Sequence, residues 1–356
     1  MDTLTHALSG ALLARATEPK AVRPDQLPPR LRMWVGFWSA AFPDSDFILR
    51  FVDPLTYLTL HRGVTHSVLL LPLWALGLAF VFSLITRGRY SWRAFVGTCA
   101  LAIAIHIAGD IITAFGTLVF APLSDWRAQI PVTFIIDPYF TGIIVMGLVA
   151  AVWVRPPRAA ALAALLVLAG FVGFQALQHR RALDVGAAYI AANNLDEARA
   201  HALPQPFSPF HWLVVVEQPG GYHLAQISLT RTQALPAPDA DALWFARINA
   251  SYRPARDARW RHIPRYGNLD PQLAEAVWHS DALARYRHFA LFPALYRLDR
   301  EAARTCVWFS DLRFDLVGRH TPFRYGGCRG DAGSPWKIYR LINDDDGHEL
   351  FDKIPE

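Results

Sequence analysis

The chain has 356 residues, of which 53% are hydrophobic, and its formal net charge is +5 at pH 7. This hydrophobic share is high for a soluble unit, and membrane-spanning segments explain it. Residues 1–182 carry 15 Lys and Arg against 9 Asp and Glu, whereas the remainder carries 20 against 21. The basic excess lies in short linkers beside apolar runs, without a basic stripe of interleaved aromatics, which argues against nucleic-acid binding.

The first part of the chain, residues 1–182, is predicted to be a mainly α, polytopic membrane helix bundle. Its N-terminus has an acid where a signal peptide has cations, so we expect it to be retained. A helical span needs about 20 apolar residues, and the sequence predicts four to five spans. The continuous runs are 67–85, 95–121, 135–154 and 159–177, and a fifth run, 34–52, is interrupted at Pro43-Asp-Ser-Asp46.

The distribution of Lys and Arg predicts the orientation of these spans. Ten fall in the loops 15–32, 87–93 and 155–158, on one side, and five fall on the opposite side. This asymmetry favours a multi-pass membrane protein with a cytoplasmic N-terminus and an exported C-terminal domain. The Arg180-Arg181 pair argues the other way, and the N-terminus changes sides if 34–52 does not cross.

Residues 183–356 are predicted to form a small α+β extramembrane domain. Residues 212–229 read as two strands around a Pro-Gly-Gly turn, 271–289 have helical spacing, and 306–316 alternate like a strand. An even pair of cysteines, Cys306 and Cys328, permits one disulfide if this domain is exported.

Four polar clusters interrupt the apolar half, where ionisable groups are costly and mark functional sites. One helical turn separates His106 from Asp110, so both can face one metal ion. Imidazole and carboxylate ligands without cysteine suit zinc, manganese or iron, and more than four ligands allow one or two ions. The clusters are Asp2 with His6, Asp44 with Asp46, His61 with His66, and His106 with Asp110.

Each cluster also has a structural interpretation. Asp2 and His6 can open a helix, the two aspartates beside Pro43 can form an interfacial turn, and His61 and His66 can sit at a helix start. The pair on the long apolar run can instead form a contact between helices or a proton relay.

Two further residues are candidates for chemistry. Asp137 precedes a proline at the start of a span, where it can cap the helix or act as a catalyst or ligand. Arg62 is a candidate to hold an anionic oxygen by forked hydrogen bonds, or to snorkel at the interface.

The motifs Asp2-x-x-Thr-His6, Pro43-Asp-Ser-Asp46, His61-Arg-Gly-Val-Thr-His66-Ser and His106-x-x-x-Asp110 occur in this order within residues 1–140. Together they resemble the bacterial inner-membrane, metal-dependent hydrolases of the YdjM-like type. The resemblance implies an integral membrane protein whose metal site draws on these positions, and a hydrolase activity. The implied ligands are His6, Asp44, Asp46, His61, His66, His106 and Asp110, and zinc is the first choice of metal.

The expected function is hydrolysis of an ester or phosphoester of a lipid-like substrate by metal-activated water. A metal or Arg62 would stabilise the oxyanion, and Asp46 or Asp137 would accept the proton. The sequence predicts contact with membrane lipids and identifies no protein partner. The alternatives are a proton- or ion-coupled transporter and a non-catalytic envelope scaffold with a structural metal.

Overall fold

The computed structural model divides the chain into two compact units. It describes residues 1–20, 23, 25–239, 241–301, 304–316, 321–330, 333–342 and 348–349. About half of the chain is helical, and a separate sheet-rich region lies towards its C-terminus. The first unit comprises Met1–Val52, Leu60–His179 and Pro204–Pro209, and the second comprises Asp53–Thr59, Arg180–Leu203 and Phe210–Glu356.

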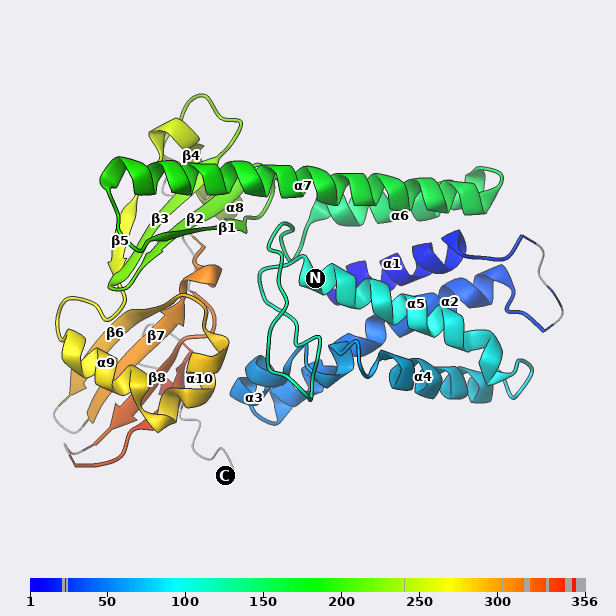
Figure 1. The fold of residues 1–356 in the computed structure, drawn as a ribbon, viewed down its shortest axis with the longest axis horizontal. Helices are drawn as coiled ribbons and strands as arrows, with labels where there is room; N and C mark the ends of the chain where they lie inside the picture. The colour runs from blue at the N-terminus through cyan, green and yellow to red at the C-terminus, as the bar shows by residue number, and fades with distance from the viewer. Residues whose placement is uncertain are drawn as a thin grey trace. The chain divides into compact units, whose positions relative to one another are not determined.

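The helices of the first unit begin where the sequence supplies capping groups. Asp2 caps α1 by accepting from the backbone N–H of Thr5 at 3.0 Å. Asp137 caps α6 by accepting from two backbone N–H groups, and Pro138 fills a first-turn position that needs no donor. The helical elements of this unit (Figure 1) are α1 (Thr3–Ala16), α2 (Pro29–Ala41), η1 (Phe42–Phe51), η2 (Val64–His66), α4 (Leu71–Ile85), α5 (Trp92–Ile111), α6 (Pro138–Trp153) and the first part of α7 (Pro157–Asn193).

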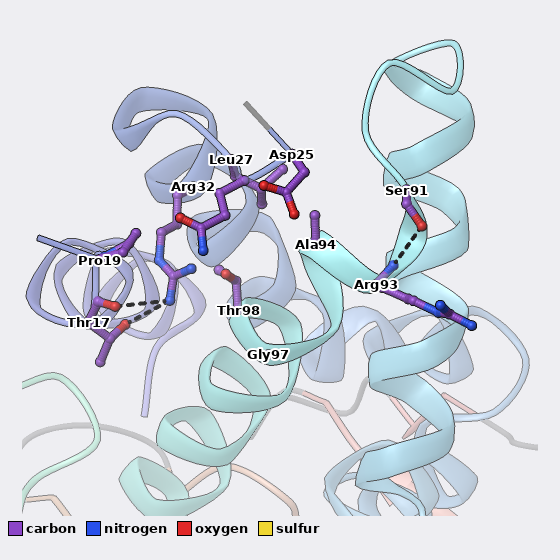
Figure 2. Close-up of a pocket in the computed structure, with 11 residues that line it drawn as sticks. Thr17, Pro19, Asp25, Leu27, Arg32, Ser91, Arg93, Ala94, Gly97 and Thr98 are labelled. Atoms are coloured by element: carbon purple, nitrogen blue, oxygen red, sulfur yellow. Dashed lines mark hydrogen bonds between the residues drawn. The ribbon is translucent and has the colours of Figure 1, made fainter. Parts of the chain in front are cut away.

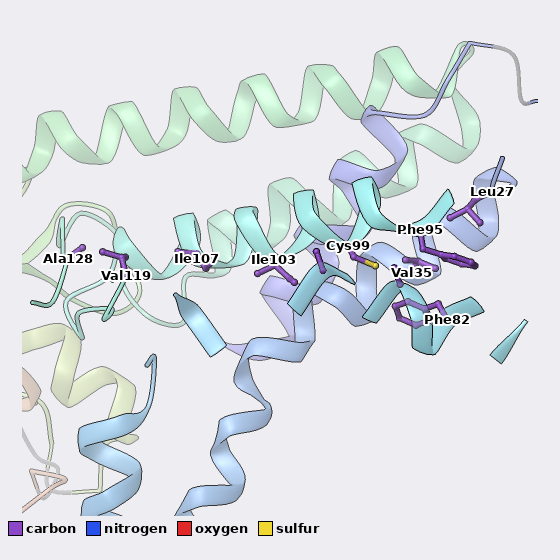
Figure 3. Packing of buried hydrophobic residues seen from close by; sticks show 11 residues of the cluster. Leu27, Val35, Phe82, Phe95, Cys99, Ile103, Ile107, Val119 and Ala128 are labelled. Carbon is purple, nitrogen blue, oxygen red and sulfur yellow. The ribbon is translucent and has the colours of Figure 1, made fainter. Parts of the chain in front are cut away.

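Helix α5 carries the main packing stripe of the first unit. Phe95, Cys99 and Ile103 lie one turn apart along it and are fully buried, with Val35 of α2 and Phe82 of α4 in the same cluster (Figure 3). Close packing of this kind supplies much of the association energy between helices in a membrane. Because buried positions recur every three or four residues, the same stripe continues to the end of α5 and buries the polar residues there.

Helices α1 and α2 approach each other through two glycines. A Cβ on Gly10 would lie 2.3 Å from the carbonyl oxygen of Gly36, and a Cβ on Gly36 would lie 2.5 Å from the carbonyl oxygen of Gly10. No other residue type fits such a contact, which is the small-residue packing typical of membrane helices. The contact brings the start of α1 and the end of α2 to the same end of α5.

Two helices in the described part of the chain, α5 and α7, are long and apolar enough to cross a membrane. The helical segments 54–66 and 71–85 form a bent pair that adds a third span if it crosses as one. Helix α6 has 16 residues, about 24 Å, which is shorter than the roughly 30 Å hydrocarbon core. The predicted count of four to five spans is therefore not confirmed.

Local breaks in the helices explain why the predicted four to five spans and the two or three candidate spans of the structure differ. The apolar run 67–85 contains a break before Leu71, and the run 95–121 ends as a helix at Ile111. The interrupted run 34–52 behaves as its sequence predicts, because α2 ends at Ala41 and the 3-10 helix η1 follows at the Pro43 motif. Apolar composition extends beyond the helices here, so a count of apolar runs does not by itself give the number of spans.

The second unit contains two five-stranded sheets. In the first sheet the order is β1-β2-β3-β4, with β5 also paired to β3, and in the second it is β10-β9-β8-β7-β6. The strands are β1 (Arg199–Pro204), β2 (His211–Gln218), β3 (Gly221–Ser228), β4 (Arg253–Pro254), β5 (Arg261–Pro264), β6 (Pro293–Glu301), β7 (Arg304–Asp311), β8 (Tyr325–Arg329), β9 (Lys337–Leu341) and β10 (His348–Glu349). The helical elements are α3 (Pro54–Leu60), α8 (Trp244–Ser251), η3 (Ala255–Asp257), α9 (Pro271–His279), η4 (Asp281–Leu283), α10 (Ala284–Phe289) and η5 (Leu312–Phe314).

The predicted strands around the Pro-Gly-Gly turn are confirmed as the antiparallel pair β2 and β3, whose register closes at Gln218 and Gly221. The predicted helix 271–289 is interrupted, because Ser280 has an extended backbone between α9 and η4. The predicted strand 306–316 is shorter than expected, since β7 ends at Asp311, whose side chain caps η5.

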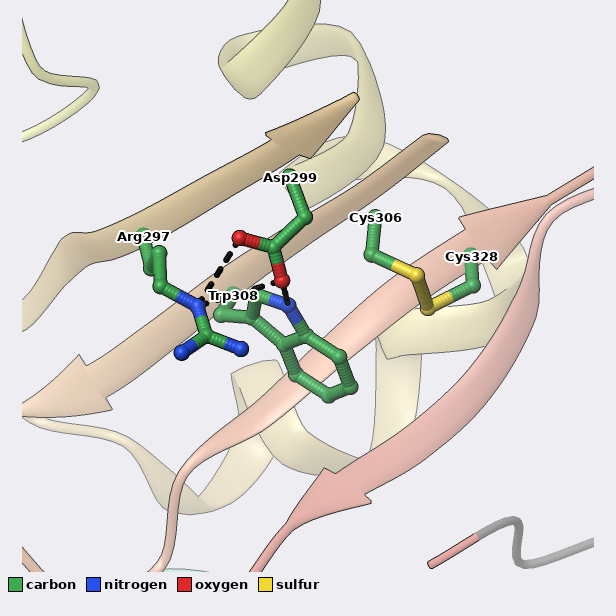
Figure 4. The surroundings of a disulfide bond; sticks show 5 residues. All are labelled: Arg297, Asp299, Cys306, Trp308 and Cys328. Carbon is green, nitrogen blue, oxygen red and sulfur yellow. Dashed lines mark hydrogen bonds and ion pairs between the residues drawn. A yellow bond between two sulfur atoms is a disulfide. The ribbon is translucent and has the colours of Figure 1, made fainter. Parts of the chain in front are cut away.

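The two cysteines of the second unit form a disulfide across neighbouring strands. Cys306 of β7 lies directly opposite Cys328 of β8 and is bonded to it (Figure 4). Beside the bond, the indole Nε1 of Trp308 donates to Asp299 at 2.8 Å, and Arg297 pairs with the same carboxylate at 2.9 Å. The disulfide therefore closes a loop next to a buried tryptophan.

Removal of this disulfide should destabilise the second unit. A bridge that closes a loop of this length stabilises a fold by about 3 kcal/mol, mainly by restricting the unfolded chain. We expect the double variant Cys306→Ser/Cys328→Ser to unfold at a lower urea concentration than the parent. Limited proteolysis of the full chain in detergent, at increasing urea concentrations, measures the unfolding midpoint. A reducing agent should lower the urea midpoint of the parent and leave the midpoint of the double variant unchanged. Equal midpoints for the oxidised and reduced parent would contradict the prediction.

Candidate metal centre

The last turn of α5 places His106 and Asp110 in the interior of the first unit. Both side chains are fully buried, at the end of the packing stripe that includes Phe95 and Ile103. His66 ends η2 and is also fully buried, while Asp44 lies in the first turn of η1 with 8% of its surface exposed. Three elements thus deliver two imidazoles and two carboxylates to one place. We call Asp44, His66, His106 and Asp110 the His/Asp cluster.

One ligand atom from each member of the His/Asp cluster lies within 4.8 Å of the other three. Nε2 of His66 is 2.9 Å from Nε2 of His106, 3.2 Å from Oδ2 of Asp110 and 3.6 Å from Oδ1 of Asp44. Nε2 of His106 is 3.4 Å from Oδ2 of Asp110 and 3.6 Å from Oδ1 of Asp44. Five of the six separations are therefore between 2.9 and 3.6 Å.

These separations fit the size of a tetrahedral metal site. With metal–ligand bonds of about 2.0–2.2 Å, the ligands of a tetrahedron lie roughly 3.3–3.6 Å apart. Oδ2 of Asp110 is buried and has no hydrogen-bond partner among the described residues, which is unusual for a carboxylate oxygen. A divalent cation between the four atoms would satisfy this oxygen and both imidazoles, so the residues present fit such an ion.

Outer contacts hold both imidazole rings with Nε2 towards the centre. Nδ1 of His106 lies 2.6 Å from the carbonyl oxygen of Ala40, at the end of α2. Nδ1 of His66 lies 3.0 Å from the hydroxyl of Thr65. Hydrogen bonds of this kind fix the tautomer and orientation of histidines that bind metals. The close approach of α2, made possible by Gly10 and Gly36, is what brings the Ala40 carbonyl within reach.

The second oxygen of Asp110, Oδ1, faces cationic and polar groups. Nη2 of Arg62 lies 2.9 Å from it, Nε2 of His6 lies 3.0 Å from it, and the amino group of Met1 also contacts it. Arg62 is 1% exposed, and its Nη1 donates to the hydroxyl of Thr113 at 2.8 Å. The buried carboxylate is thus compensated on one oxygen and open to the centre of the His/Asp cluster on the other.

Asp46 and His61 form a pair beside the cluster. Nδ1 of His61 lies 2.8 Å from Oδ1 of Asp46, and the backbone N–H of Arg62 donates to Oδ2 at 3.0 Å. The same carboxylate lies 3.6 Å from Nδ1 of His66, the outward nitrogen of that ring. Asp46 therefore links the His61 side chain to the outer edge of the His/Asp cluster.

Of the seven predicted ligands, the structure brings four together and places the other three around them. His6 contacts Asp110 and stacks on His106 with ring centroids 3.7 Å apart, while Asp46 and His61 pair as described. Asp2 accepts from Thr5 as the cap of α1, which is the structural interpretation of its position. The described residues contain one group with the geometry of a metal site, which favours one ion.

Of the predicted catalytic residues, Asp137 lies outside the His/Asp cluster. It caps α6, and Nε2 of Gln175 donates to its other oxygen at 2.7 Å. Arg62 is directed at Asp110 and Thr113. Two groups at the site were not predicted from the sequence. Thr113 follows Asp110 by one helical turn, which is a usable signal, whereas the Ala40 carbonyl belongs to the backbone, for which side-chain patterns carry no signal.

A pocket of about 630 Å³ lies at the other end of α5, near the end of α1 and the start of α2 (Figure 2). Arg32 lines it, and its guanidinium donates to the carbonyl oxygens of Ala14 and Thr17 at 3.1 and 3.3 Å. These bonds satisfy carbonyl groups at the C-terminal end of α1. None of the lining residues belongs to the His/Asp cluster, so this pocket is not part of the metal centre.

Apolar spans around a buried group of imidazoles and carboxylates define an integral membrane protein with a candidate metal site. Comparison with known proteins gives the family: residues 1–182 match the family described as YdjM inner membrane protein, and the chain belongs to it. A stretch of 140 residues is 28% identical to the uncharacterized protein YfhP of Bacillus subtilis. That match covers 39% of this chain and 42% of the relative, so it spans less than half of either protein. No solved structure matches the chain.

Loss of a member of the His/Asp cluster should abolish metal binding. We expect the parent, purified in detergent, to hold about one divalent ion per chain. His66→Ala and Asp110→Asn should lower the metal content at least about tenfold, because each removes a direct donor. Elemental analysis by mass spectrometry measures the content, and size-exclusion chromatography checks the fold.

His262→Ala and Asp25→Asn serve as matched controls, since both lie outside the cluster. They should retain the metal content of the parent. Folded His66→Ala and Asp110→Asn proteins that keep their metal would contradict the assignment of the site.

Proposed function

We propose that the protein is a membrane-bound metal-dependent hydrolase that cleaves an ester or phosphoester bond of a lipid-like substrate. The observation that carries this proposal is the close approach of four donor atoms in the His/Asp cluster, all within 4.8 Å of one another. Catalytic metal sites in hydrolases combine such donors with access for water and substrate. The position of the cluster among apolar helices favours a substrate with an apolar part.

The donor set favours zinc, with manganese or iron as alternatives. Two imidazoles with carboxylates and no thiolate match the ligand preferences of these ions. A divalent ion held there would supply Lewis acidity, lowering the pKa of a water molecule towards about 7 so that hydroxide is available near neutral pH. The residues around the site then have to accept the proton that the water molecule loses and to balance the charge of the site.

Asp46 and His61 are the groups that we assign to proton transfer. Their 2.8 Å contact is that of a histidine oriented by a carboxylate, which is a common arrangement of a general base. Asp137, the other candidate from the sequence, already accepts three hydrogen bonds, two at the start of α6 and one from Gln175. Asp46 also accepts three, from His61, Arg62 and Thr65. The choice of Asp46 therefore rests on its place beside the cluster, 3.6 Å from Nδ1 of His66.

Arg62 is assigned a positioning role. Its guanidinium is buried and bonds Asp110 and Thr113, so it acts on the substrate through Asp110. By neutralising one oxygen of that carboxylate, Arg62 directs the other oxygen towards the centre of the His/Asp cluster. This role replaces the direct contact with a substrate anion that the sequence suggested.

In the membrane, we propose a multi-pass arrangement with α5 and α7 as spans and the bent pair 54–85 as a third. Four to five spans would require α6 and the interrupted run 34–52 to cross as well. If α6 and 34–52 cross as well, the ten-to-five distribution of Lys and Arg supports a cytoplasmic location of the loops 15–32, 87–93 and 155–158. The Cys306–Cys328 disulfide supports a periplasmic second unit, because disulfides persist in oxidising compartments.

The proposal predicts hydrolysis that depends on Asp46. Metal-loaded protein in detergent should cleave at least one member of a panel of phospholipids and chromogenic esters and phosphoesters. Asp46→Asn should lower kcat by about 10²–10⁴-fold, the usual contribution of a general base, while the metal content stays that of the parent. Asp137→Asn is the matched control and should change kcat far less.

The same preparation separates the rival functions. Absence of hydrolysis throughout the panel, with the metal bound, would contradict the hydrolase proposal. Ion flux in proteoliposomes that is lost in Asp110→Asn would then identify a transporter, whereas unfolding on metal removal without flux would identify a scaffold.

A further inference from the structure

An apolar groove lies between helices of the first unit, and His6, which contacts the His/Asp cluster, is one of its lining residues. It has a volume of about 370 Å³ and is lined by residues of α1, α5, α6 and α7, all within the first unit. Apart from His6 and Ser9, its lining side chains are apolar or absent, and they include Ile105, Phe140 and Leu168. A pocket of this size, apolar with a few polar groups at one place, is typical of a small-molecule site.

His6 connects the groove to the cluster. Its side chain is 1% exposed, lines the groove, and reaches Asp110 through Nε2 at 3.0 Å. Its other ring nitrogen, Nδ1, lies close to Gly109 of α5. A Cβ on Gly109, which also lines the groove, would lie 3.3 Å from this nitrogen. An imidazole that contacts Asp110 of the cluster therefore also lines the groove.

The opposite wall of the groove belongs to the membrane-spanning helices. α5 and α7 are the two helices long and apolar enough to cross a membrane, and both contribute to the groove. Ala108 of α5 and Ala169 of α7 are exposed lining residues, so small side chains keep the groove accessible from the helix surface. Leu166 and Val167 beside it on α7 are more than half exposed, as expected for contact with lipid.

We propose that this groove binds one acyl chain of the lipid substrate, so that the bond to be cleaved lies beside His6 at the His/Asp cluster. The inference rests on the proposed hydrolase function and names its substrate class. The lining favours an apolar occupant: it carries no Lys, Arg, Asp or Glu, and the amino group of Met1, which also lines it, is paired with Asp110. The cluster, in contrast, carries the polar groups that a head group needs. His6 lines the groove and contacts Asp110, so it is the residue that both parts of one amphipathic molecule would share.

The test is photolabelling of the full chain in lipid nanodiscs, which requires no turnover. The probe is phosphatidylglycerol with a diazirine on one acyl chain, and labelled peptides are mapped by mass spectrometry. Ala108→Trp and Ala169→Trp fill the groove from its two walls. Ala104→Trp and Ala163→Trp are matched controls on exposed positions of the same helices that do not line the groove.

We expect labels on groove residues of the parent, and a loss of about tenfold in both groove variants, the discrimination that an apolar pocket achieves by shape. The control variants should keep the labelling of the parent. Labels spread evenly over the lipid-facing positions, or unchanged in the groove variants, would show bulk lipid only and overturn the proposal. Groove labelling without hydrolysis would support the acyl-chain site and contradict the hydrolase, so the two failures are distinguishable.

Discussion

The carboxylate of Asp110 is the constraint on which the arrangement of the first unit depends. A fully buried charge is tolerated only when it is paired and hydrogen-bonded, and otherwise costs several kcal/mol. Arg62 and His6 meet this need on one oxygen, and two imidazoles face the other. The segments that carry these partners are therefore held against the end of α5.

Helix packing satisfies this constraint through very short contacts. The glycine contact between α1 and α2 brings His6 and the Ala40 carbonyl to the cluster, since neither helix could approach as closely with larger side chains. The apolar stripe of α5 packs so that His106 and Asp110 lie where α1 begins and α2 ends. The same helices leave the apolar groove beside His6, so packing and the proposed substrate site share their elements.

The sequence predicted the cluster better than it predicted the spans. Rare ionisable residues among apolar ones are informative, and the spacing of His106 and Asp110 places both on one helix face, as the structure has them. The split between Asp44 and Asp46 could not be predicted, because both lie in one irregular turn and only tertiary contacts direct one inward. The predicted four to five spans are not confirmed, because α6 has 16 residues and the run 34–52 is interrupted where α2 ends at Ala41.

The most direct measurement is X-ray absorption spectroscopy of the metal in the purified full chain. We expect only nitrogen and oxygen donors around the metal ion, with the multiple scattering of the two imidazoles of His66 and His106. His106→Gln should reduce that signal to one imidazole or release the ion. A shell that contains sulfur, or one that keeps both imidazoles in His106→Gln, would contradict the His/Asp cluster as the metal centre.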